Sequence, residues 1–141
     1  MERLTKVMDK YLKKAVADWD KKKVLTLVVS KEWFDMIVAG RKTEEYREIK
    51  PYWVRRILDM SRAKVGADTI SLALQYDVIR DRKDIFKEHG KVLTHVLFIN
   101  GYRKDSPRIE KEIESITIGK PKKGLCPDKW LDTEFFIIKF K

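Results

Sequence analysis

Apolar residues recur at helical spacing over the first 20 positions of the chain. Counted from Leu4, they fall at i, i+3, i+4, i+7, i+8, i+11 and i+15 and form one stripe that ends at Trp19. The opposite face is basic and carries Arg3, Lys6, Lys10, Lys13 and Lys14. We predict an amphipathic helical extension over residues 1–23 that packs on the main domain. Such a helix can also lie on a membrane or on nucleic acid.

The pattern changes at Val24, where a short apolar and β-branched run predicts a buried strand over residues 24–29. Further strands are expected over residues 42–49, 69–79, 92–99, 109–118 and 135–140, with Glu110, Glu112 and Glu114 on one side of their strand. Short helices are expected after an N-cap at Ser30, from Pro51, and over residues 84–89. This order predicts an α+β domain over residues 24–141, built on a small, mostly antiparallel sheet or barrel.

The composition of the chain indicates what kind of partner it can bind. The 141 residues suit one domain, and 43% of them are apolar, enough for a core. Charged residues reach 38%, and 32 Lys plus Arg against 22 Asp plus Glu give a net charge of +10. A basic surface binds polyanions by releasing their counterions, so this charge suits a polyanionic partner. Simple dispersal of a soluble domain by its lysines explains the same charge.

Several classes of function are disfavoured by what the sequence lacks. Cys126 is the single cysteine and the histidines number two, so a disulfide or a zinc site is not expected. There is no run of 18 apolar residues, no signal-peptide core, and no phosphate-binding or nucleophile motif. We therefore expect a cytoplasmic protein without a metal, a cofactor or a membrane partner.

The segment Gly40–Arg47 concentrates charge where a strand is expected. Side chains alternate along a strand, which places Lys42, Glu44 and Tyr46 on one side. Thr43, Glu45 and Arg47 then lie on the other side. Whichever side is internal must bury charge, and buried charges are either structural ion pairs or functional groups with shifted pKa values.

The segment Trp33–Arg47 resembles the signature of the ASCH (activating-signal-cointegrator homology) domains. The matching positions are Gly40, Lys42, Glu45 and Arg47. Later strands of the family are matched by the segments Phe98–Tyr102, Ile116–Gly119 and Phe135–Phe140. The resemblance covers about residues 24–141 and leaves the N-terminal helix outside.

The resemblance implies a PUA-like β-barrel with short helices at its rim, and an RNA-binding cleft lined by the motif. Lys42 and Arg47 would meet phosphate or a base edge, and Glu45 would accept a hydrogen bond from a nucleobase amino group. Aromatic residues would stack on an exposed base, although each can equally belong to the core. The expected ligand-binding residues are Arg41, Lys42, Thr43, Glu45, Tyr46, Arg47, Trp53, Asn100 and Tyr102, with Trp130 as a further stacking candidate.

Two other functions stay open. Some ASCH-like proteins are ribonucleases or acetylcytidine amidohydrolases, and in an enzyme of this kind Lys42 and Glu45 would be catalytic. The amidohydrolases keep a Thr where this chain has Glu45, and neighbouring carboxylates are expected to raise the pKa of Lys42 away from that of a base. Alternatively, the N-terminal helix binds a protein partner or a second copy of the chain.

Overall fold

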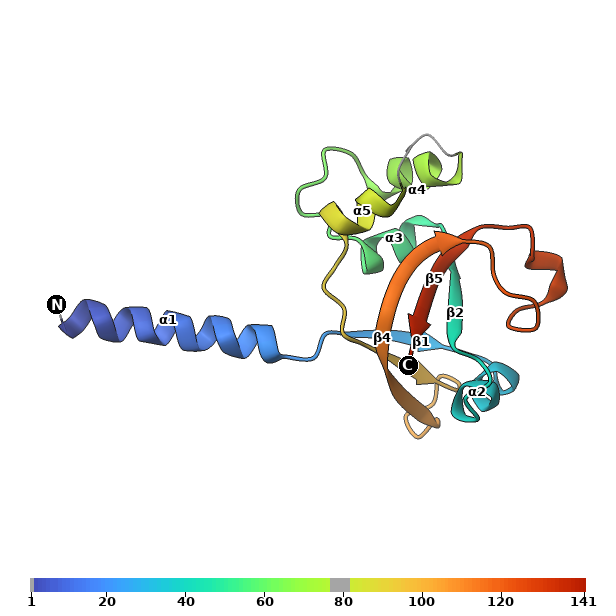
Figure 1. Ribbon diagram of the computed structural model, residues 1–141, viewed down its shortest axis with the longest axis horizontal. Helices are drawn as coiled ribbons and strands as arrows, with labels where there is room; N and C mark the ends of the chain where they lie inside the picture. The colour runs from blue at the N-terminus through green and yellow to red at the C-terminus, as the bar shows by residue number, and fades with distance from the viewer. Residues whose placement is uncertain (1, 77–81) are drawn as a thin grey trace.

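A five-stranded sheet with several helices forms the body of the protein, in a computed structural model that describes residues 2–76 and 82–141 (Figure 1). The strands are β1 (Val24–Val28), β2 (Glu44–Glu48), β3 (His95–Ile99), β4 (Arg108–Gly119) and β5 (Phe135–Phe140). Their order across the sheet is β1-β3-β4-β5-β2. The β1–β3 pair is parallel and the other pairs are antiparallel. The predicted α+β class and the mostly antiparallel sheet are confirmed.

The long strand β4 curves the sheet because its two halves pair with different neighbours. Residues 108–112 pair with β3 and residues 113–119 pair with β5, with a register shift between Ile113 and Ser115. Such a bulge bends a strand and increases its twist, and Figure 1 shows the bend of β4. The predicted glutamate face of β4 is exposed and forms the ion pairs Glu110–Lys22, Glu112–Lys141 and Glu114–Lys139.

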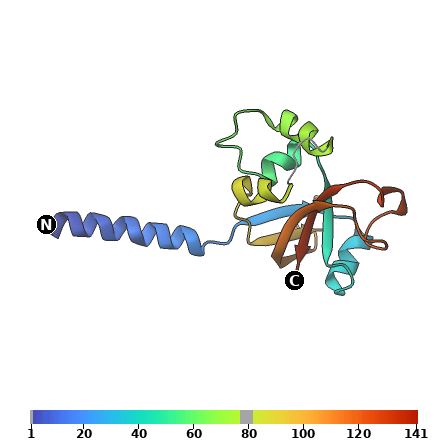
Figure 2. The ribbon, with the colours of Figure 1, turned by 45° about the horizontal axis from the view of Figure 1, so that its top comes forward.

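Apart from α1, the helices form two groups around the sheet. The helices are α1 (Glu2–Asp20), α2 (Lys31–Val38), α3 (Pro51–Ile57), α4 (Ala67–Gln75) and α5 (Arg82–His89), with a 3₁₀ turn, η1, at Asp128–Trp130. Figures 1 and 2 show α3, α4 and α5 gathered on one side of the sheet, while α2 lies at the far end of β2. The predicted helices after Ser30, from Pro51 and near residues 84–89 are therefore confirmed.

The hydrophobic core joins the sheet to α2, α3, α4 and α5. In β1 and β3 every second side chain is buried, as the alternation of apolar residues predicts. In α3 the buried side chains are Val54 and Ile57, while Arg55 and Arg56 are exposed. Central core residues are Leu25, Leu27, Phe34, Ile37, Val54, Ile57, Leu58, Leu74, Val96, Phe98, Phe136 and Ile138.

The strand predicted over residues 69–79 is wrong. Residues 67–75 form α4, and residues 77–79 of that prediction lie outside the described residues. The alternation of Ile70, Leu72 and Leu74 imitates a strand, but Leu72 is exposed. The buried positions Ala67, Ser71 and Leu74 follow helical spacing instead.

The sheet is open, so the predicted closed barrel is not what the described residues form. β1 and β2 are its two edge strands, and no backbone ladder joins them in the described part of the chain. A side chain crosses between them: the guanidinium of Arg47 donates to the carbonyl oxygen of Val28 at 2.8 Å. The opening between these strands holds the pocket described below.

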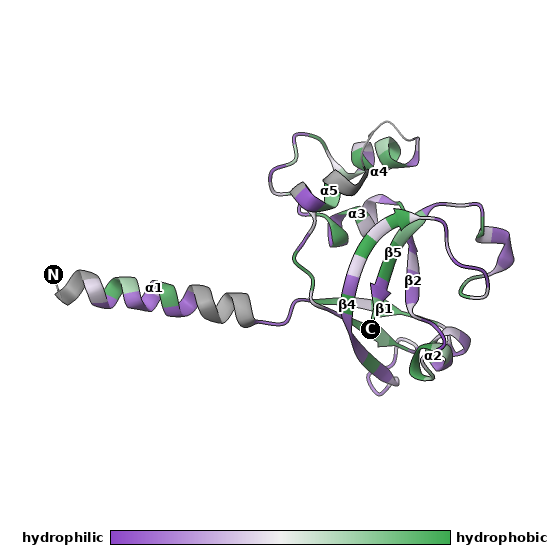
Figure 3. Ribbon diagram, in the orientation of Figure 1, coloured by the Kyte–Doolittle hydropathy of each residue, from purple (hydrophilic) through white to green (hydrophobic). Residues whose placement is uncertain are grey.

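Helix α1 projects away from the rest of the molecule in both ribbon views (Figures 1 and 2). The helix itself is predicted correctly, but its packing on the domain is not. Apolar and hydrophilic positions mix along its middle part (Figure 3), where the apolar Val7, Met8, Tyr11 and Leu12 are all exposed. Among the described helices, none combines the length and the apolar character needed to cross a membrane.

Candidate functional site

A pocket of about 390 Å³ lies in the opening between the two edge strands. The end of β1, the start of α2, strand β2, helix α3 and the loop before β5 all contribute to it. Its lining residues are Val28, Val29, Ser30, Trp33, Lys42, Glu45, Tyr46, Arg47, Glu48, Trp53, Leu125, Cys126, Pro127, Trp130 and Phe135. The pocket thus combines aromatic walls with three buried or half-buried charged groups from the Gly40–Arg47 segment.

A turn at the end of α2 positions the first of these charges. Gly40 has a φ of +77°, a left-handed conformation that favours glycine. The backbone N–H groups of Arg41 and Lys42 both donate to the carbonyl oxygen of Met36, at 3.0 and 3.1 Å. This cap satisfies a free carbonyl group of the helix and turns the chain so that Lys42 points inward. The Gly-x-Lys element is therefore a helix cap that directs a lysine into the pocket.

Lys42 is almost completely buried, with 1% of its surface exposed. Its Nζ donates to the carbonyl oxygen of Leu125 and lies 3.6 Å from Glu45 Oε1. Two aromatic faces surround the ammonium group, with ring centroids 4.6 Å away at Trp33 and 5.1 Å away at Tyr46. A buried ammonium needs such partners because leaving it unpaired costs several kcal/mol, roughly.

Burial lowers the pKa of Lys42 below its ordinary value, although Glu45 acts in the opposite direction. Glu45 raises this pKa, as the sequence predicts, but removal from water outweighs the attraction of Glu45 and sets the net direction. The alternation predicted for Lys42 is wrong. Strand β2 begins at Glu44, so Lys42 belongs to the turn and meets Glu45 instead of sharing a side with Glu44.

The contacts of Glu45 with the protein are made through one of its carboxylate oxygens, Oε1. It is 6% exposed. Oε1 accepts a hydrogen bond from the backbone N–H of Tyr46 at 2.9 Å and lies 3.6 Å from Lys42 Nζ and 3.8 Å from Arg47. Oε2 makes no hydrogen bond or ion pair with any residue that the structure describes. A buried acceptor without a partner is costly, so it favours a donor from a ligand or from water.

Arg47 is held rigidly at the pocket wall. One of its terminal nitrogens donates to Val28 O at 2.8 Å and the other to Tyr46 O at 3.1 Å. Its guanidinium lies 5.3 Å from the ring centroid of Trp53. These contacts fix a positive charge at the pocket without neutralising it fully, since Glu45 is 3.8 Å away and shared with Lys42.

Glu44 and Tyr46 fasten the loop that closes the pocket. The Tyr46 hydroxyl donates to Glu44 Oε2 at 2.9 Å and accepts a hydrogen bond from the backbone N–H of Lys122 at 3.1 Å. Lys122 Nζ lies 3.2 Å from the other oxygen of Glu44. Burial raises the pKa of Tyr46, so the hydroxyl keeps its proton. Together with the bond from Lys42 to Leu125, these contacts hold residues 120–127 against β2.

The predicted ligand-binding residues fall into two groups. Lys42, Glu45, Tyr46, Arg47 and Trp53 line the pocket, and so does Trp130. The remaining predicted residues are not among those that line it: Arg41 and Thr43 are exposed beside the turn, and Asn100 and Tyr102 lie between β3 and β4, with Tyr102 93% exposed.

Sequence reasoning missed part of the wall. Trp33, the carbonyl group of Leu125, and Cys126 all line the pocket. Trp33 precedes Gly40 by seven residues, about two helical turns, and this spacing could have linked it to the motif. Nothing in the sequence marks Leu125 or Cys126, because the loop reaches the motif only through tertiary contacts.

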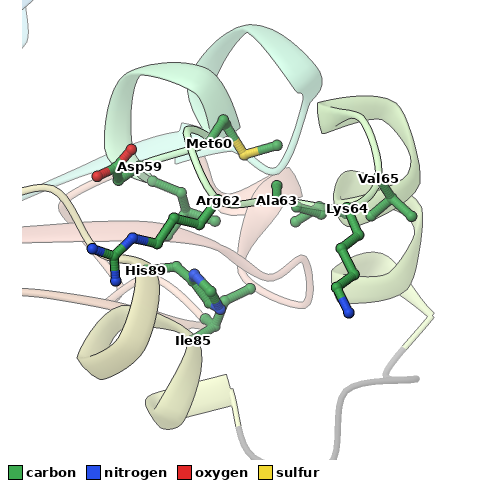
Figure 4. Close-up of a pocket in the computed structure, with 10 residues that line it drawn as sticks. Asp59, Met60, Arg62, Ala63, Lys64, Val65, Ile85 and His89 are labelled. Atoms are coloured by element: carbon green, nitrogen blue, oxygen red, sulfur yellow. The ribbon is translucent and has the colours of Figure 1, made fainter.

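A second cavity of about 430 Å³ lies between the segment after α3, residues 58–65, and helices α4 and α5 (Figure 4). Its walls are mostly apolar, with Leu58, Met60, Ala63, Val65, Ile70 and Ile85. Its cationic side chains, Arg62 and Lys64, extend in different directions in Figure 4 and do not converge on one point. Specific recognition needs polar groups that converge, and the pocket around Lys42 has them. Among the described residues, no group of three or more His, Cys, Asp or Glu side chains is placed to hold a metal ion.

No protein-family model, curated protein or solved structure matches this chain. The protein is therefore classified from its own fold and site. It is an α+β protein with an open five-stranded sheet, and the two edge strands of the sheet enclose an aromatic pocket with buried charges.

Proposed function

We propose that residues 24–141 form an ASCH-type, PUA-like module that binds RNA or a nucleotide in the cytoplasm. The observation that carries this proposal is the set Lys42, Glu45 and Arg47, which is buried or half-buried yet lines a pocket. If these three charged side chains served stability alone, they would form ion pairs closed off from any pocket. Here an acceptor oxygen of Glu45 has no described partner, and aromatic rings lie on the same walls.

A nucleotide suits the chemistry of this pocket. A base can stack against Trp33 or Trp53, which is worth about 1–3 kcal/mol per base. Glu45 Oε2 then accepts a hydrogen bond from an exocyclic amino group, a contact that distinguishes amino-bearing bases from the others. Arg47 and Lys42 supply positive charge for a base carbonyl or a phosphate. The basic side chains of the surrounding surface add salt-dependent attraction.

Fluorescence anisotropy with a labelled single-stranded RNA tests the proposal. Lys42→Met keeps the length of the buried side chain and Arg47→Gln keeps a donor, so both variants are expected to fold. Each should weaken RNA binding at least tenfold, and the affinity of the wild type should fall as salt is added. Lys104→Met, which removes an exposed lysine between β3 and β4, is the matched control. Full affinity in the Lys42→Met, Arg47→Gln double variant contradicts the proposal.

A second candidate is a metal-independent hydrolase that acts on RNA or a modified nucleoside. The lowered pKa of Lys42 favours it, because a lysine serves as a base only when its pKa approaches neutrality. Burial raises the pKa of the Cys126 thiol, which keeps its proton and is a poor nucleophile. The candidate nucleophile is then water activated by Lys42, which lies 3.6 Å from Glu45.

Turnover assays separate this candidate from simple binding. An enzyme of this kind consumes RNA or ribonucleosides without added metal, loses turnover in Lys42→Met and keeps it in Cys126→Ser. Unchanged substrate after long incubation with the wild type excludes the hydrolase and leaves binding as the function.

A third candidate concerns α1 alone. Its exposed apolar residues Val7, Met8, Tyr11 and Leu12 support a role in binding a protein partner or a second copy of the chain. Deletion of residues 1–20 should then abolish the association and leave RNA binding unchanged.

A further inference from the structure

We infer that a groove along the free edge of β1 is a second nucleotide subsite, so that the ligand is single-stranded RNA and not a free nucleotide. The inference rests on the proposed function and specifies its substrate. It is carried by the position, charge and aromatic content of the groove.

The groove continues the pocket. It has a volume of about 470 Å³ and shares Val28 with the pocket around Lys42. Its lining residues are Val24, Leu25, Thr26, Val28, Tyr52, Arg56, Lys91 and Leu93. On the helix side, Tyr52 of the groove and Trp53 of the pocket contact each other edge to face, with ring centroids 4.9 Å apart. An RNA strand that has one base in the pocket therefore places its next nucleotide in the groove.

The charge of the groove has a single sign. Its charged lining residues are Arg56 and Lys91, and no carboxylate is among the lining residues. The other lining side chains are apolar or uncharged, so this positive charge is not paired within the groove. Lys91 Nζ donates to the carbonyl oxygen of Arg55 at 2.7 Å, which holds its charge close to α3. Two cations beside an uncharged floor fit a phosphate-linked backbone better than a neutral ligand.

An exposed aromatic ring completes the subsite. Tyr52 is 52% exposed although it sits beside Trp53. The guanidinium of Arg56 lies 4.1 Å from its ring centroid. Arg56 therefore lies over an aromatic ring that is half exposed. Single-stranded nucleic acids stack their bases on such aromatic and arginine groups without sequence preference.

The same edge can also accept a peptide strand, since β1 has a free side. Two observations favour RNA. The carbonyl of Val28 already accepts a bond from Arg47, so the edge is not fully available for a peptide ladder. At the other end the groove reaches Val24, directly after the exposed lysines 21–23, of which Lys22 pairs with Glu110. Binding of an acidic peptide in place of RNA is one outcome that overturns the inference.

The experiment compares a labelled ten-nucleotide RNA with a single ribonucleotide used as an unlabelled competitor. The wild type should bind the oligomer more tightly than the mononucleotide. Tyr52→Ala and Arg56→Gln should weaken oligomer binding about fivefold to a hundredfold, as expected for one stacked base. Arg56→Gln should also lower the salt slope by about 0.7, the value for one phosphate contact. Mononucleotide affinity should stay unchanged in both variants.

Matched controls come from the turn between β3 and β4, where Tyr102→Ala and Arg103→Gln remove a similar pair of exposed side chains. If Tyr52→Ala and Arg56→Gln leave oligomer affinity unchanged while Lys42→Met reduces it, the groove inference fails and the proposed function stands. If the groove variants reduce binding and Lys42→Met does not, the pocket fails as the nucleotide site. If no RNA or nucleotide binds the wild type, or if only an acidic peptide binds, both the groove inference and the proposed function fail.

Discussion

Removing the hydroxyl group of Tyr46 should destabilise the protein and loosen the wall of the pocket. The Tyr46→Phe variant keeps the ring, which lies 5.1 Å from Lys42 Nζ and 6.3 Å from the ring of Phe135. It loses two hydrogen bonds, one to Glu44 Oε2 at 2.9 Å and one from the Lys122 N–H at 3.1 Å. Glu44 is buried and then depends on the exposed Lys122 side chain alone.

The size of the effect follows from these two bonds. A hydrogen bond to a charged group contributes about 1.5–3 kcal/mol and one between neutral groups about 0.5–1.5 kcal/mol. Because the Lys122 N–H lies at the surface, water can replace its partner and the lower value applies. We expect the free energy of unfolding to fall by about 2–3.5 kcal/mol. For a chain of this size each kcal/mol lowers Tm by about 3 °C, which gives a decrease of about 6–10 °C.

Urea unfolding and thermal melts followed by circular dichroism measure this loss. Tyr52→Phe is the control, since Tyr52 is half exposed and its hydroxyl has no described partner. The control should change the free energy of unfolding by less than about 0.5 kcal/mol. Equal effects of the two substitutions refute the reasoning. A double-mutant cycle with Glu44→Gln should in addition show coupling of at least about 1 kcal/mol.

Three further predictions concern the motif and the first helix. Because the pKa of Lys42 is lowered in the folded state, the unfolded chain binds more protons just below the ordinary value of 10.5, and wild-type stability should rise with pH in that window. Lys42→Met should flatten this rise in urea titrations between pH 7 and 10, and an unchanged slope contradicts the lowered pKa. Gly40→Ala should cost about 1–2 kcal/mol in unfolding free energy because of the positive φ, and Gly40→Asn less. Nothing lies within 4 Å of an added Cβ there, so equal costs for Ala and Asn would point to a cause other than backbone strain. Deleting residues 1–20 should leave the melting temperature of the remaining domain within about 2 °C, since the described apolar residues of α1 pack on nothing.

The sequence predicted the strands well where one face of the sheet is buried. Residues 95–99, 108–119 and 135–140 alternate clearly or are continuously apolar, and all form strands. It failed over residues 67–75, where a short run satisfies both periods and tertiary contacts, with α3 and with the carbonyl group of Ile49, favour the helix. It also predicted a packed α1, because amphipathic spacing says which side of a helix is apolar but not what covers it.

The candidate site could be predicted in part. Lys42, Glu45 and Arg47 are close together in sequence, and the structure places all three at one pocket. Their partners Val28 and Leu125 are distant in sequence and contribute backbone carbonyl groups, which no side-chain pattern reveals. The sign of the pKa shift of Lys42 also required the structure. It depends on the balance of burial against one carboxylate, and a sequence shows only the carboxylate.

Nuclear magnetic resonance of the tryptophan indole groups tests most directly whether the pocket holds a nucleotide. The chain has four tryptophans, and Trp33, Trp53 and Trp130 line the pocket. Titration of ¹⁵N-labelled protein with a ribonucleotide should shift these three indole signals along one saturable curve, and Lys42→Met should abolish the shifts. Indole signals that stay in place at millimolar ribonucleotide, or shift equally in Lys42→Met, would contradict a nucleotide-binding pocket at this site.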